Sequence, residues 1–308
     1  MEAPLYYLAR AVVAFVQALP LTWVARLGRW GGGLAYWLDK RHRRVALRNL
    51  TLCFGREQSQ AQLRALAREN FRRLGENYLC AIKTAIMTYE ELSPRVSFVG
   101  NPVLTAVPAE GTPPNVVAAI GHFGNFELYA RFGQFAPAFQ CGTTYRALRQ
   151  PSLNRLLQSL RERSGCLYFE RRFDSQALKA FMNRTGVIMG FLSDQSGGTV
   201  RVPFLGHECA TTAAPAIFAL RYHCVLLPAI CYRVALAQWR IEAGAEIPTH
   251  ENGQARSAAA IMSDVNRAFE AAVRRDPANW FWVHRRWKPP PPEARLSAAA
   301  ETVRPQCQ

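Results

Sequence analysis

His122 and Glu127 are two residues whose types and spacing fit acid–base chemistry. They follow an apolar run at 116–120 and precede a helix-like run, and Gly121 and Gly124 stand between the two runs. This pattern predicts a buried strand, a tight turn and a new helix. A histidine at the carboxyl end of a strand, with a carboxylate close by, is suited to act as a general base with an orienting partner.

The five-residue spacing restricts where the two side chains lie, because side chains meet on one helix face at a spacing of three or four. We therefore expect His122 in the turn, Asn125 at the N-cap and Glu127 in the first helical turn. From there the carboxylate would fold back to the imidazole. A simpler interpretation stays open, since a glutamate in a first turn is favourable through the helix dipole alone.

Length, composition and charge restrict the class of protein. The chain has 308 residues, of which 49% are hydrophobic, so one large domain or two small ones with a sizeable core are expected. The net charge of +16 favours an anionic partner, which is nucleic acid, anionic lipid or an acidic carrier protein.

The positive charge is concentrated near the N-terminus. Residues 1–73 hold thirteen Lys or Arg against four Asp or Glu, a net charge of +9. The same region contains the aromatic residues Tyr6, Tyr7, Phe15, Trp23, Trp30, Tyr36 and Trp37. Apolar and aromatic residues flanked by arginines favour a membrane-surface anchor over a nucleic-acid-binding arm. We expect no nucleic-acid partner, because neither zinc-finger spacing nor an aromatic RNA-binding signature occurs.

Two apolar segments, 5–19 and 22–38, predict N-terminal helices. A bilayer-spanning helix needs about 20 predominantly apolar residues, and arginines interrupt both segments. We expect helices that lie in or dip into a membrane, although a single span or ordinary buried helices stay as alternatives. The basic cluster 40–44 would keep the following domain cytoplasmic if a span existed. A signal peptide is disfavoured, because the first nine residues hold no Lys or Arg.

Eight cysteines are dispersed along the chain without a Cys-x-x-Cys pair. This distribution is typical of reduced thiols that pack as small hydrophobic side chains. No Cys/His ligand spacing recurs, so we expect no metal site.

From residue 115 onward, strand-like and helix-like segments alternate. The strands are expected at 116–120, 139–144, 166–169, 187–192 and 225–231, and the helices at 126–135, 151–163, 175–183, 212–222 and 255–274. An earlier helix is expected at 59–86 and a short strand at 96–99. This order predicts an α/β fold, a mostly parallel central sheet flanked by helices. Functional crevices in such sheets lie at the carboxyl ends of the strands, where His122 falls.

The chain divides into three expected parts. Residues 1–50 would form N-terminal membrane-associating helices, and residues 51–288 would form the α/β domain. Residues 289–308 begin with a run of prolines and are expected to be a disordered tail.

Polar groups follow several successive strands, and their order carries a resemblance. The segments are His122-x4-Glu127, Tyr145-Arg146, Arg161, Ser193-Asp194-Gln195, Val202-Pro203-Phe204, Thr211-Thr212 and His284-Arg285-Arg286. Together and in this order, the chain from about residue 5 to 288 resembles the late lipid A biosynthesis acyltransferases of Gram-negative bacteria. These lauroyl- and myristoyltransferases are related to the glycerolipid acyltransferases.

The resemblance implies a glycerolipid-acyltransferase-like enzyme of the cell inner membrane, with its active site facing the cytoplasm. Such an enzyme moves a fatty acyl chain from an acyl-carrier-protein thioester to a hydroxyl of a lipid A precursor, without a metal or other cofactor. The implied partners are acyl carrier protein (or acyl-CoA), a lipid acceptor and anionic lipids. A different glycolipid, aminolipid or lysophospholipid acceptor stays open, as does a basic binding protein with a degenerate site.

Under this resemblance, His122 and Glu127 match the catalytic pair, and Arg161 and Asp194 match two further functional positions. His122 would remove the hydroxyl proton, Glu127 would orient the imidazole, and Asp194 would order an arginine or a sugar hydroxyl. Arg161 or an amide of the turn 121–124 would stabilise the oxyanion. The candidate substrate-binding residues are Asn125, Tyr145, Arg146, Arg171, Arg172 and Gln195. An acyl-enzyme route is disfavoured because no Gly-x-Ser-x-Gly segment is present.

Overall fold

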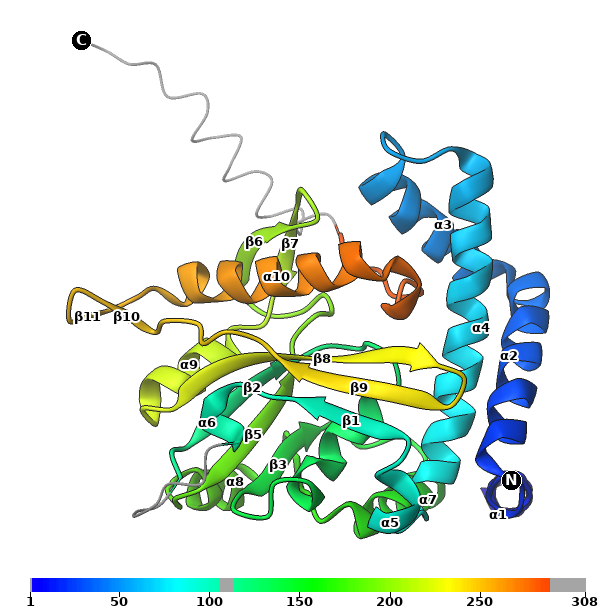
Figure 1. The fold of residues 1–308 in the computed structure, drawn as a ribbon, viewed down its shortest axis with the longest axis horizontal. Helices are drawn as coiled ribbons and strands as arrows, with labels where there is room; N and C mark the ends of the chain where they lie inside the picture. Colours follow the sequence, from blue (N-terminus) through cyan, green and yellow to red (C-terminus); the bar gives the residue numbers. More distant parts are fainter. Residues whose placement is uncertain (1, 106–112, 289–308) are drawn as a thin grey trace.

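A central sheet of seven strands organises the molecule, in a computed structural model that describes residues 2–105 and 113–288 (Figure 1). The strands are β1 (Val96–Val99), β2 (Val116–Ile120), β3 (Gln140–Tyr145), β4 (Leu167–Glu170), β5 (Val187–Leu192), β8 (Val225–Ala235) and β9 (Gln238–Ala243). Their spatial order is β1-β9-β8-β2-β5-β3-β4. The expected tail at 289–308 lies outside the described residues.

Five of these strands, β8, β2, β5, β3 and β4, run parallel to one another. The predicted α/β fold with a mostly parallel sheet is therefore confirmed. Strand β9 was not predicted. It pairs antiparallel with β8 through a tight turn and parallel with β1, so it joins the edge strand β1 to the sheet.

Three helices cover one face of the sheet: α8 (Ser175–Met182), α9 (Ala214–Arg221) and α10 (Ala258–Arg275). The sequence of the last helix places the apolar residues Ile261, Val265, Phe269 and Val273 at four-residue steps, which predicts a core-facing stripe. All four side chains of this stripe are fully buried. On this face the stripe packs with residues such as Val117 and Met189 in the main core. The hairpin β6 (Val200–Phe204) and β7 (His207–Thr211), which the sequence analysis did not predict, packs against α10.

The opposite face of the sheet is covered differently. A 3₁₀ helix, η1 (Phe126–Gln134), follows β2, and α7 (Pro151–Arg161) with η2 (Glu162–Ser164) follows β3. The remaining short elements are α5 (Tyr89–Leu92), α6 (Pro102–Thr105), β10 (His250–Glu251), β11 (Gln254–Ala255) and η3 (Pro277–Asn279).

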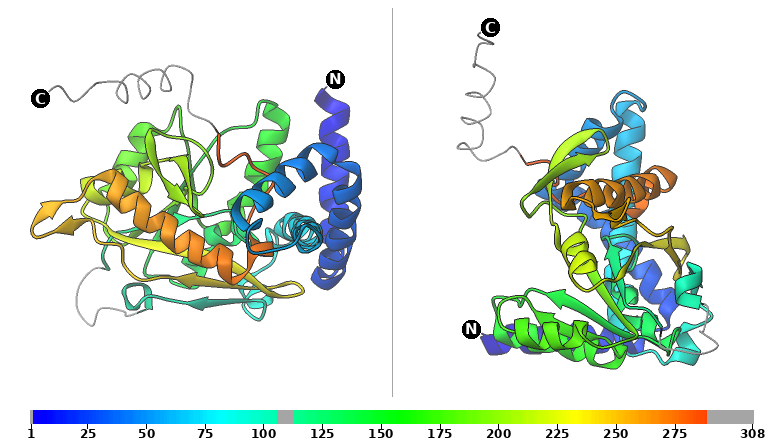
Figure 2. Two further views of the ribbon diagram at one scale, coloured as in Figure 1. Left: turned by 90° about the horizontal axis from the view of Figure 1, so that it is seen from above. Right: turned by 90° about the vertical axis from the view of Figure 1, so that its left-hand side faces the viewer.

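Four helices form the N-terminal part: α1 (Glu2–Ala18), α2 (Leu21–Leu38), α3 (Lys40–Phe54) and α4 (Gln60–Thr84). The expected boundary after residue 50 falls inside α3. Helices α2 and α4 approach closely because Gly28 and Gly32 face Gly75. A Cβ at Gly32 would lie 2.1 Å from the Phe71 carbonyl oxygen. Helix α1 lies beside α7 (Figure 2).

Neither of the two N-terminal segments matches a bilayer-spanning helix. Within residues 2–105 and 113–288, no helix is both long and apolar enough to cross a membrane. The alternative of a single span therefore lacks support. Helices α1 and α2 nevertheless carry many exposed apolar side chains, among them Tyr7, Leu8, Phe15, Trp23, Trp30 and Trp37.

Candidate functional site

His122 lies at the end of β2, in a turn that leads into η1. The turn requires Gly124, which has φ +52°, and a Cβ there would lie 2.5 Å from the Cys231 carbonyl oxygen. Glu127 lies in the first turn of η1 and Asn125 at its N-cap, as predicted, although the Asn125 side chain makes no capping hydrogen bond. The positions of His122, Asn125 and Glu127 along the turn and the helix were therefore predicted correctly.

The imidazole of His122 is bound by Asp194. Strand β5, which ends two residues before Asp194, is the direct neighbour of β2, so the residues that follow the two strands meet at one edge of the sheet. Nδ1 of His122 lies 2.7 Å from Asp194 Oδ1, and the His122 backbone N–H donates to Asp194 Oδ2 over 2.9 Å. The indole of Trp280 donates to the same Oδ2 over 2.8 Å.

Asp194 is buried and charged, with 1% of its surface exposed. Burial alone would raise its pKa, but the His122 imidazole and the hydrogen bonds from His122 and Trp280 hold that pKa below its usual value. Because an ionised carboxylate can only accept, His122 Nδ1 must be the donor. In the neutral form of this ring, Nε2 is therefore the nitrogen that carries the lone pair.

The predicted contact between Glu127 and His122 is wrong. Glu127 instead binds Arg161 through two hydrogen bonds, Nη2 to Oε1 over 2.7 Å and Nε to Oε2 over 3.2 Å. The guanidinium also lies over the ring of Tyr168, at 4.9 Å from its centroid. Burial alone would lower the pKa of Arg161, but Glu127 raises it above the usual value, so the guanidinium stays charged.

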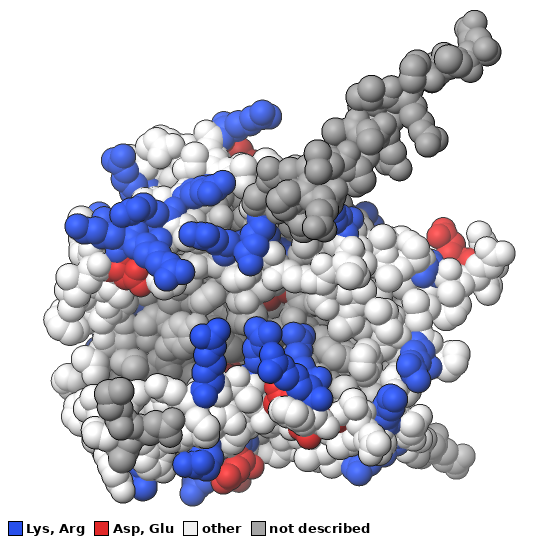
Figure 3. All heavy atoms as spheres, turned by 180° about the vertical axis from the view of Figure 1, so that it is seen from behind, with Lys and Arg blue, Asp and Glu red and all other residues white. Residues whose placement is uncertain are grey.

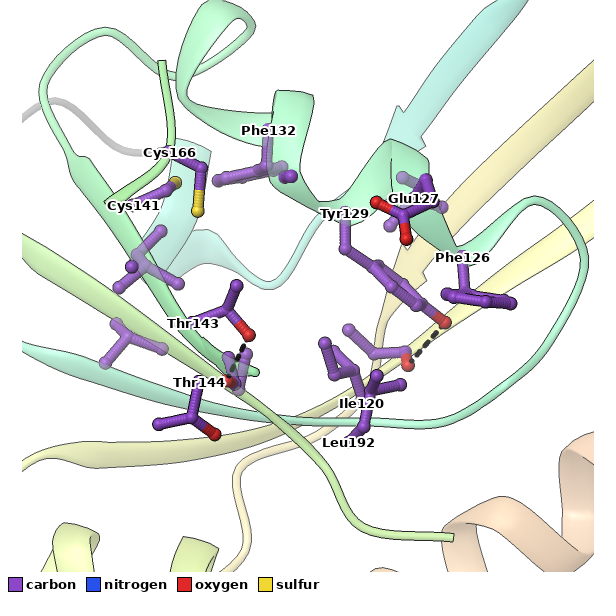
Figure 4. Close-up of a pocket in the computed structure, with 18 of the residues that line it drawn as sticks. Ile120, Phe126, Glu127, Tyr129, Phe132, Cys141, Thr143, Thr144, Cys166 and Leu192 are labelled. Atoms are coloured by element: carbon purple, nitrogen blue, oxygen red, sulfur yellow. Dashed lines mark hydrogen bonds between the residues drawn. The ribbon is translucent and has the colours of Figure 1, made fainter. Parts of the chain in front are cut away.

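His122 is one of the residues that line a cavity of about 990 Å³. This cavity lies on the sheet face that η1 covers (Figure 4). Alternate residues of several strands line it, because successive side chains of a strand point to opposite faces. They include Val116, Ala118 and Ile120 of β2, Ile188, Gly190 and Leu192 of β5, and Leu227 and Ala229 of β8. Tyr129 and Phe132 of η1, with Phe135 directly after it, form the opposite wall. The cavity is therefore an apolar space of the kind that a hydrocarbon chain fills.

The structure places four of the six candidate substrate-binding residues in the wall of the large cavity. Tyr145, Arg146, Arg171 and Gln195 line the large cavity, as do His122, Glu127 and Arg161. Asn125 does not line it and is buried beside Thr84.

The back of the molecule is hollowed, and Lys and Arg side chains gather above and below the hollow (Figure 3).

Arg172 is not brought into the large cavity. Its backbone N–H donates to Glu170 Oε2 over 2.6 Å, and its residue is exposed. The expected contact between Asp194 and an arginine is not found among the described residues. Within this part of the chain, the Asp194 carboxylate binds only His122 and Trp280.

Three residues of the site come from the segment after η3. The sequence analysis used His284-Arg285-Arg286 of this segment for the family resemblance but assigned no role in the site to any of its residues. Trp280 binds Asp194, Phe281 packs against the His122 ring at 5.7 Å, and His284 lines the large cavity. Burial lowers the pKa of His284 to about 4, and its buried Nδ1 has no partner among the described residues. In the sequence, the concentration of aromatic and basic residues at 280–288 is the signal that could have indicated that this segment belongs to the site.

Two cysteines belong to the wall of the large cavity, and burial raises the pKa of both thiols. Cys141 and Cys166 line the large cavity, and burial raises the pKa of Cys141 to about 12, so this thiol is not reactive. In the part of the chain that the structure describes, no three His, Cys, Asp or Glu side chains are grouped as metal ligands.

Comparison with known proteins identifies the family of the chain. The model of the family "Bacterial lipid A biosynthesis acyltransferase" matches residues 1–289. The chain is 25% identical to a lipid A biosynthesis lauroyltransferase of Escherichia coli K12 over 295 residues, which cover 93% of this chain and 92% of the relative. It is 26% identical to a lipid A biosynthesis palmitoleoyltransferase of the same organism, over 89% of this chain and 87% of the relative. Because this family model matches nearly all residues of the chain, the chain belongs to the bacterial lipid A biosynthesis acyltransferase family and is an acyltransferase.

Proposed function

We propose that this protein is a membrane-associated O-acyltransferase that moves a fatty acyl chain from an acyl-carrier-protein thioester to a hydroxyl of a lipid A precursor. The observation that carries the proposal is the His122–Asp194 pair, whose histidine lines the 990 Å³ apolar cavity. The cavity accommodates the acyl chain, and the pair supplies the base. Family membership supports the acceptor.

In this reaction His122 Nε2 takes the proton of the acceptor hydroxyl as its oxygen attacks the thioester carbonyl. An alcohol is a weak nucleophile at neutral pH, so a positioned base is required. Asp194 keeps the imidazole in the required tautomer and stabilises the imidazolium, as the carboxylate does in a hydrolase triad. The proton then passes to the leaving thiolate, and the ester is formed.

The tetrahedral intermediate needs hydrogen-bond donors for its oxyanion. Three of the four backbone amides of the turn 121–124 are already engaged, since His122 donates to Asp194, Phe123 to Gly121 and Gly124 to Asn279. Arg161 uses Nε and Nη2 on Glu127, and its Nη1 makes no hydrogen bond among the described residues. These contacts favour Arg161 as the oxyanion-stabilising group and Glu127 as the residue that positions it.

Anionic groups of the two substrates would be bound at the rim of the cavity. Arg146 and Arg171 line it with Tyr145 and Gln195, and arginine recognises phosphate with two parallel hydrogen bonds. A phosphopantetheine and a phosphorylated glycolipid both carry such groups.

Helices α1 and α2 would attach the protein to the inner membrane, on its cytoplasmic side. Their exposed side chains include Trp30, with 69% of its surface exposed, next to arginines such as Arg26. Aromatic and basic residues together favour an anionic lipid surface. Replacing Trp30 and Trp37 with Gln should weaken flotation with anionic vesicles, whereas Phe173→Gln, an exposed aromatic in a different region, should not. Equal flotation of both variants would contradict this attachment.

An acyl-transfer assay tests the reaction itself. Purified protein is given acyl-carrier-protein thioesters and a tetra-acylated, sugar-linked lipid A precursor, and the products are read by mass spectrometry. We expect a gain of one acyl chain that is lost in His122→Ala. No gain with folded wild-type protein would refute the acceptor, and the same assay on total membrane lipid with acyl-CoA as donor would then identify a different one.

A further inference from the structure

A second, smaller cavity lies next to the first. Its volume is about 250 Å³, and its walls come from α4, the start of η1 and the end of α7. His122, Phe126, Glu127, Leu157, Arg161 and Tyr168 line both cavities. The Glu127–Arg161 ion pair therefore forms part of the wall between them, and the imidazole of His122 is reached from both sides.

Apart from the ion pair, much of the lining of the small cavity is apolar, and one buried polar atom in it has no hydrogen-bond partner among the described residues. Leu74 and Ile82 of α4 and Leu160 of α7 supply apolar surface. Asn125 also lines the cavity and is 1% exposed. Its Nδ2 donates to Thr84 Oγ1 over 3.5 Å, and its Oδ1 has no hydrogen-bond partner among the described residues. A buried carbonyl oxygen without a partner is costly, so the cavity fits an apolar ligand that carries a hydroxyl or amide N–H.

The surroundings of the small cavity indicate from which side a ligand arrives. Helix α4 packs against α2, and α7 packs against α1 (Figure 2). These two partner helices carry the exposed apolar side chains, such as Phe15 and Trp23. A lipid held in a bilayer at that surface is close to the small cavity, whereas the large cavity extends away from α4 along the sheet.

We propose that the small cavity binds a hydrocarbon arm of the acceptor lipid while the large cavity holds the acyl chain that is transferred. This inference rests on the proposed function, because acyl transfer between two lipidic substrates must bring two long chains together at one base. Two cavities that share His122 meet this requirement. Asn125 Oδ1 accepts a hydrogen bond from a hydroxyl or amide on the acceptor arm and so sets its depth.

Filling each cavity separately tests the assignment. Ala81→Phe narrows the small cavity from α4, and Leu160→Trp narrows it from α7, so the result does not depend on one variant folding well. Ala136→Phe narrows the large cavity, and Ala61→Phe adds the same bulk at an exposed position of α4. In the two small-cavity variants the acceptor arm loses apolar contact with the cavity, so the acceptor binds more weakly. The KM for the acceptor should therefore rise by about tenfold or more.

The KM for the acyl donor should respond differently from the KM for the acceptor. The KM for the acyl-carrier-protein thioester should stay within about twofold of wild type in the small-cavity variants and rise in Ala136→Phe, with Ala61→Phe unchanged in both respects. An acceptor with shortened chains should recover its KM in Ala81→Phe. An unchanged acceptor KM in both small-cavity variants, or a raised donor KM in them, would overturn the assignment.

Binding without turnover separates this inference from the proposed reaction. The same tetra-acylated precursor is titrated into His122→Ala protein with and without Ala81→Phe. Binding that is lost only with Ala81→Phe supports the small cavity even if wild-type protein fails to transfer the acyl chain, in which case the proposed reaction alone is refuted. Equal binding by both proteins overturns the assignment even if the reaction is confirmed.

Discussion

Asp194 Oδ1 lies 2.7 Å from His122 Nδ1, while Asp194 Oδ2 accepts both the His122 backbone N–H and the Trp280 indole N–H. The carboxylate thus fixes the ring and the backbone of the same residue. Because Trp280 comes from the chain beyond α10, the orientation of the base depends on segments that are distant in sequence.

Replacing Asp194 with Asn should reduce kcat strongly, whereas the free energy of unfolding should change much less. The amide offers Nδ1 a donor as readily as an acceptor, so the imidazole can adopt the tautomer in which Nε2 is protonated and cannot act as a base. In a hydrolase triad this change costs on the order of 10⁴ in kcat, and we expect a loss of about 10³ or more here.

Trp280→Phe is the matched control for that change. It removes one of the three hydrogen bonds to the carboxylate and leaves the charge, so it should cost about tenfold in kcat. Steady-state acyl transfer by the two purified variants checks the order. A Trp280→Phe enzyme as impaired as Asp194→Asn would contradict the tautomer argument.

Glu127 and Arg161 should behave as one unit. If Glu127 only positions Arg161, then Glu127→Gln and Arg161→Lys each lower kcat, and the double variant is little worse than the single ones. The KM for the acceptor should change less than kcat, because the oxyanion forms only in the transition state. A double-mutant cycle on kcat measures this coupling, and additive losses would show that Glu127 acts independently.

The fold was largely predictable because its signals are local. The strand β2 was predicted with its exact bounds, and Ile261, Val265, Phe269 and Val273 identified the buried face of α10. Strand β9 and the β6–β7 hairpin were missed. They are short antiparallel additions, and their existence depends on pairing with neighbours rather than on a long apolar run.

The partner of His122 was less predictable than its position. Sequence proximity favoured Glu127, but the β2–β5 pairing brings Asp194 to the histidine across 72 residues. Only the order of strands in the sheet decides this, and a single sequence does not contain that order in a local pattern. The role of Trp280 was missed for the same reason.

His284 should make stability depend on pH. Its folded pKa is about 4, lowered by burial and by the charges of Lys288 and Arg286 against the effect of Asp194, while the ordinary value is 6.5. Between these two values the unfolded chain binds a proton that the folded chain does not. The free energy of unfolding therefore falls as pH falls from about 6.5 to about 4.

The ring of phenylalanine does not titrate, so His284→Phe should lose this part of the pH dependence. Urea unfolding at pH 7 and pH 4.5 measures it, with carboxylates contributing equally in both proteins. The drop between the two pH values should be smaller for the variant. An identical drop would show that the proton on His284 is not excluded from the folded state.

Removing the buried carboxylate of Glu76 should strongly lower the free energy of unfolding. Its side chain is 0% exposed, Oε2 lies 2.7 Å from Arg233 Nε, and Oε1 accepts the Ala237 backbone N–H over 3.0 Å. Arg29 of α2 is 3.4 Å from the same carboxylate. Glu76 thereby ties α2 and α4 to the β8–β9 turn.

Glu76→Ala leaves the Arg233 charge and the Ala237 N–H without their acceptor, so it should destabilise the protein by about 3–5 kcal/mol. Glu57 forms an ion pair with Arg274 in which both side chains are about half exposed, and Glu57→Ala should cost about 0–1 kcal/mol. Urea unfolding of both variants at pH 7 gives the comparison. Equal losses would mean that the buried carboxylate contributes no more than a solvated one, and that the N-terminal helices are held to the sheet by apolar packing alone.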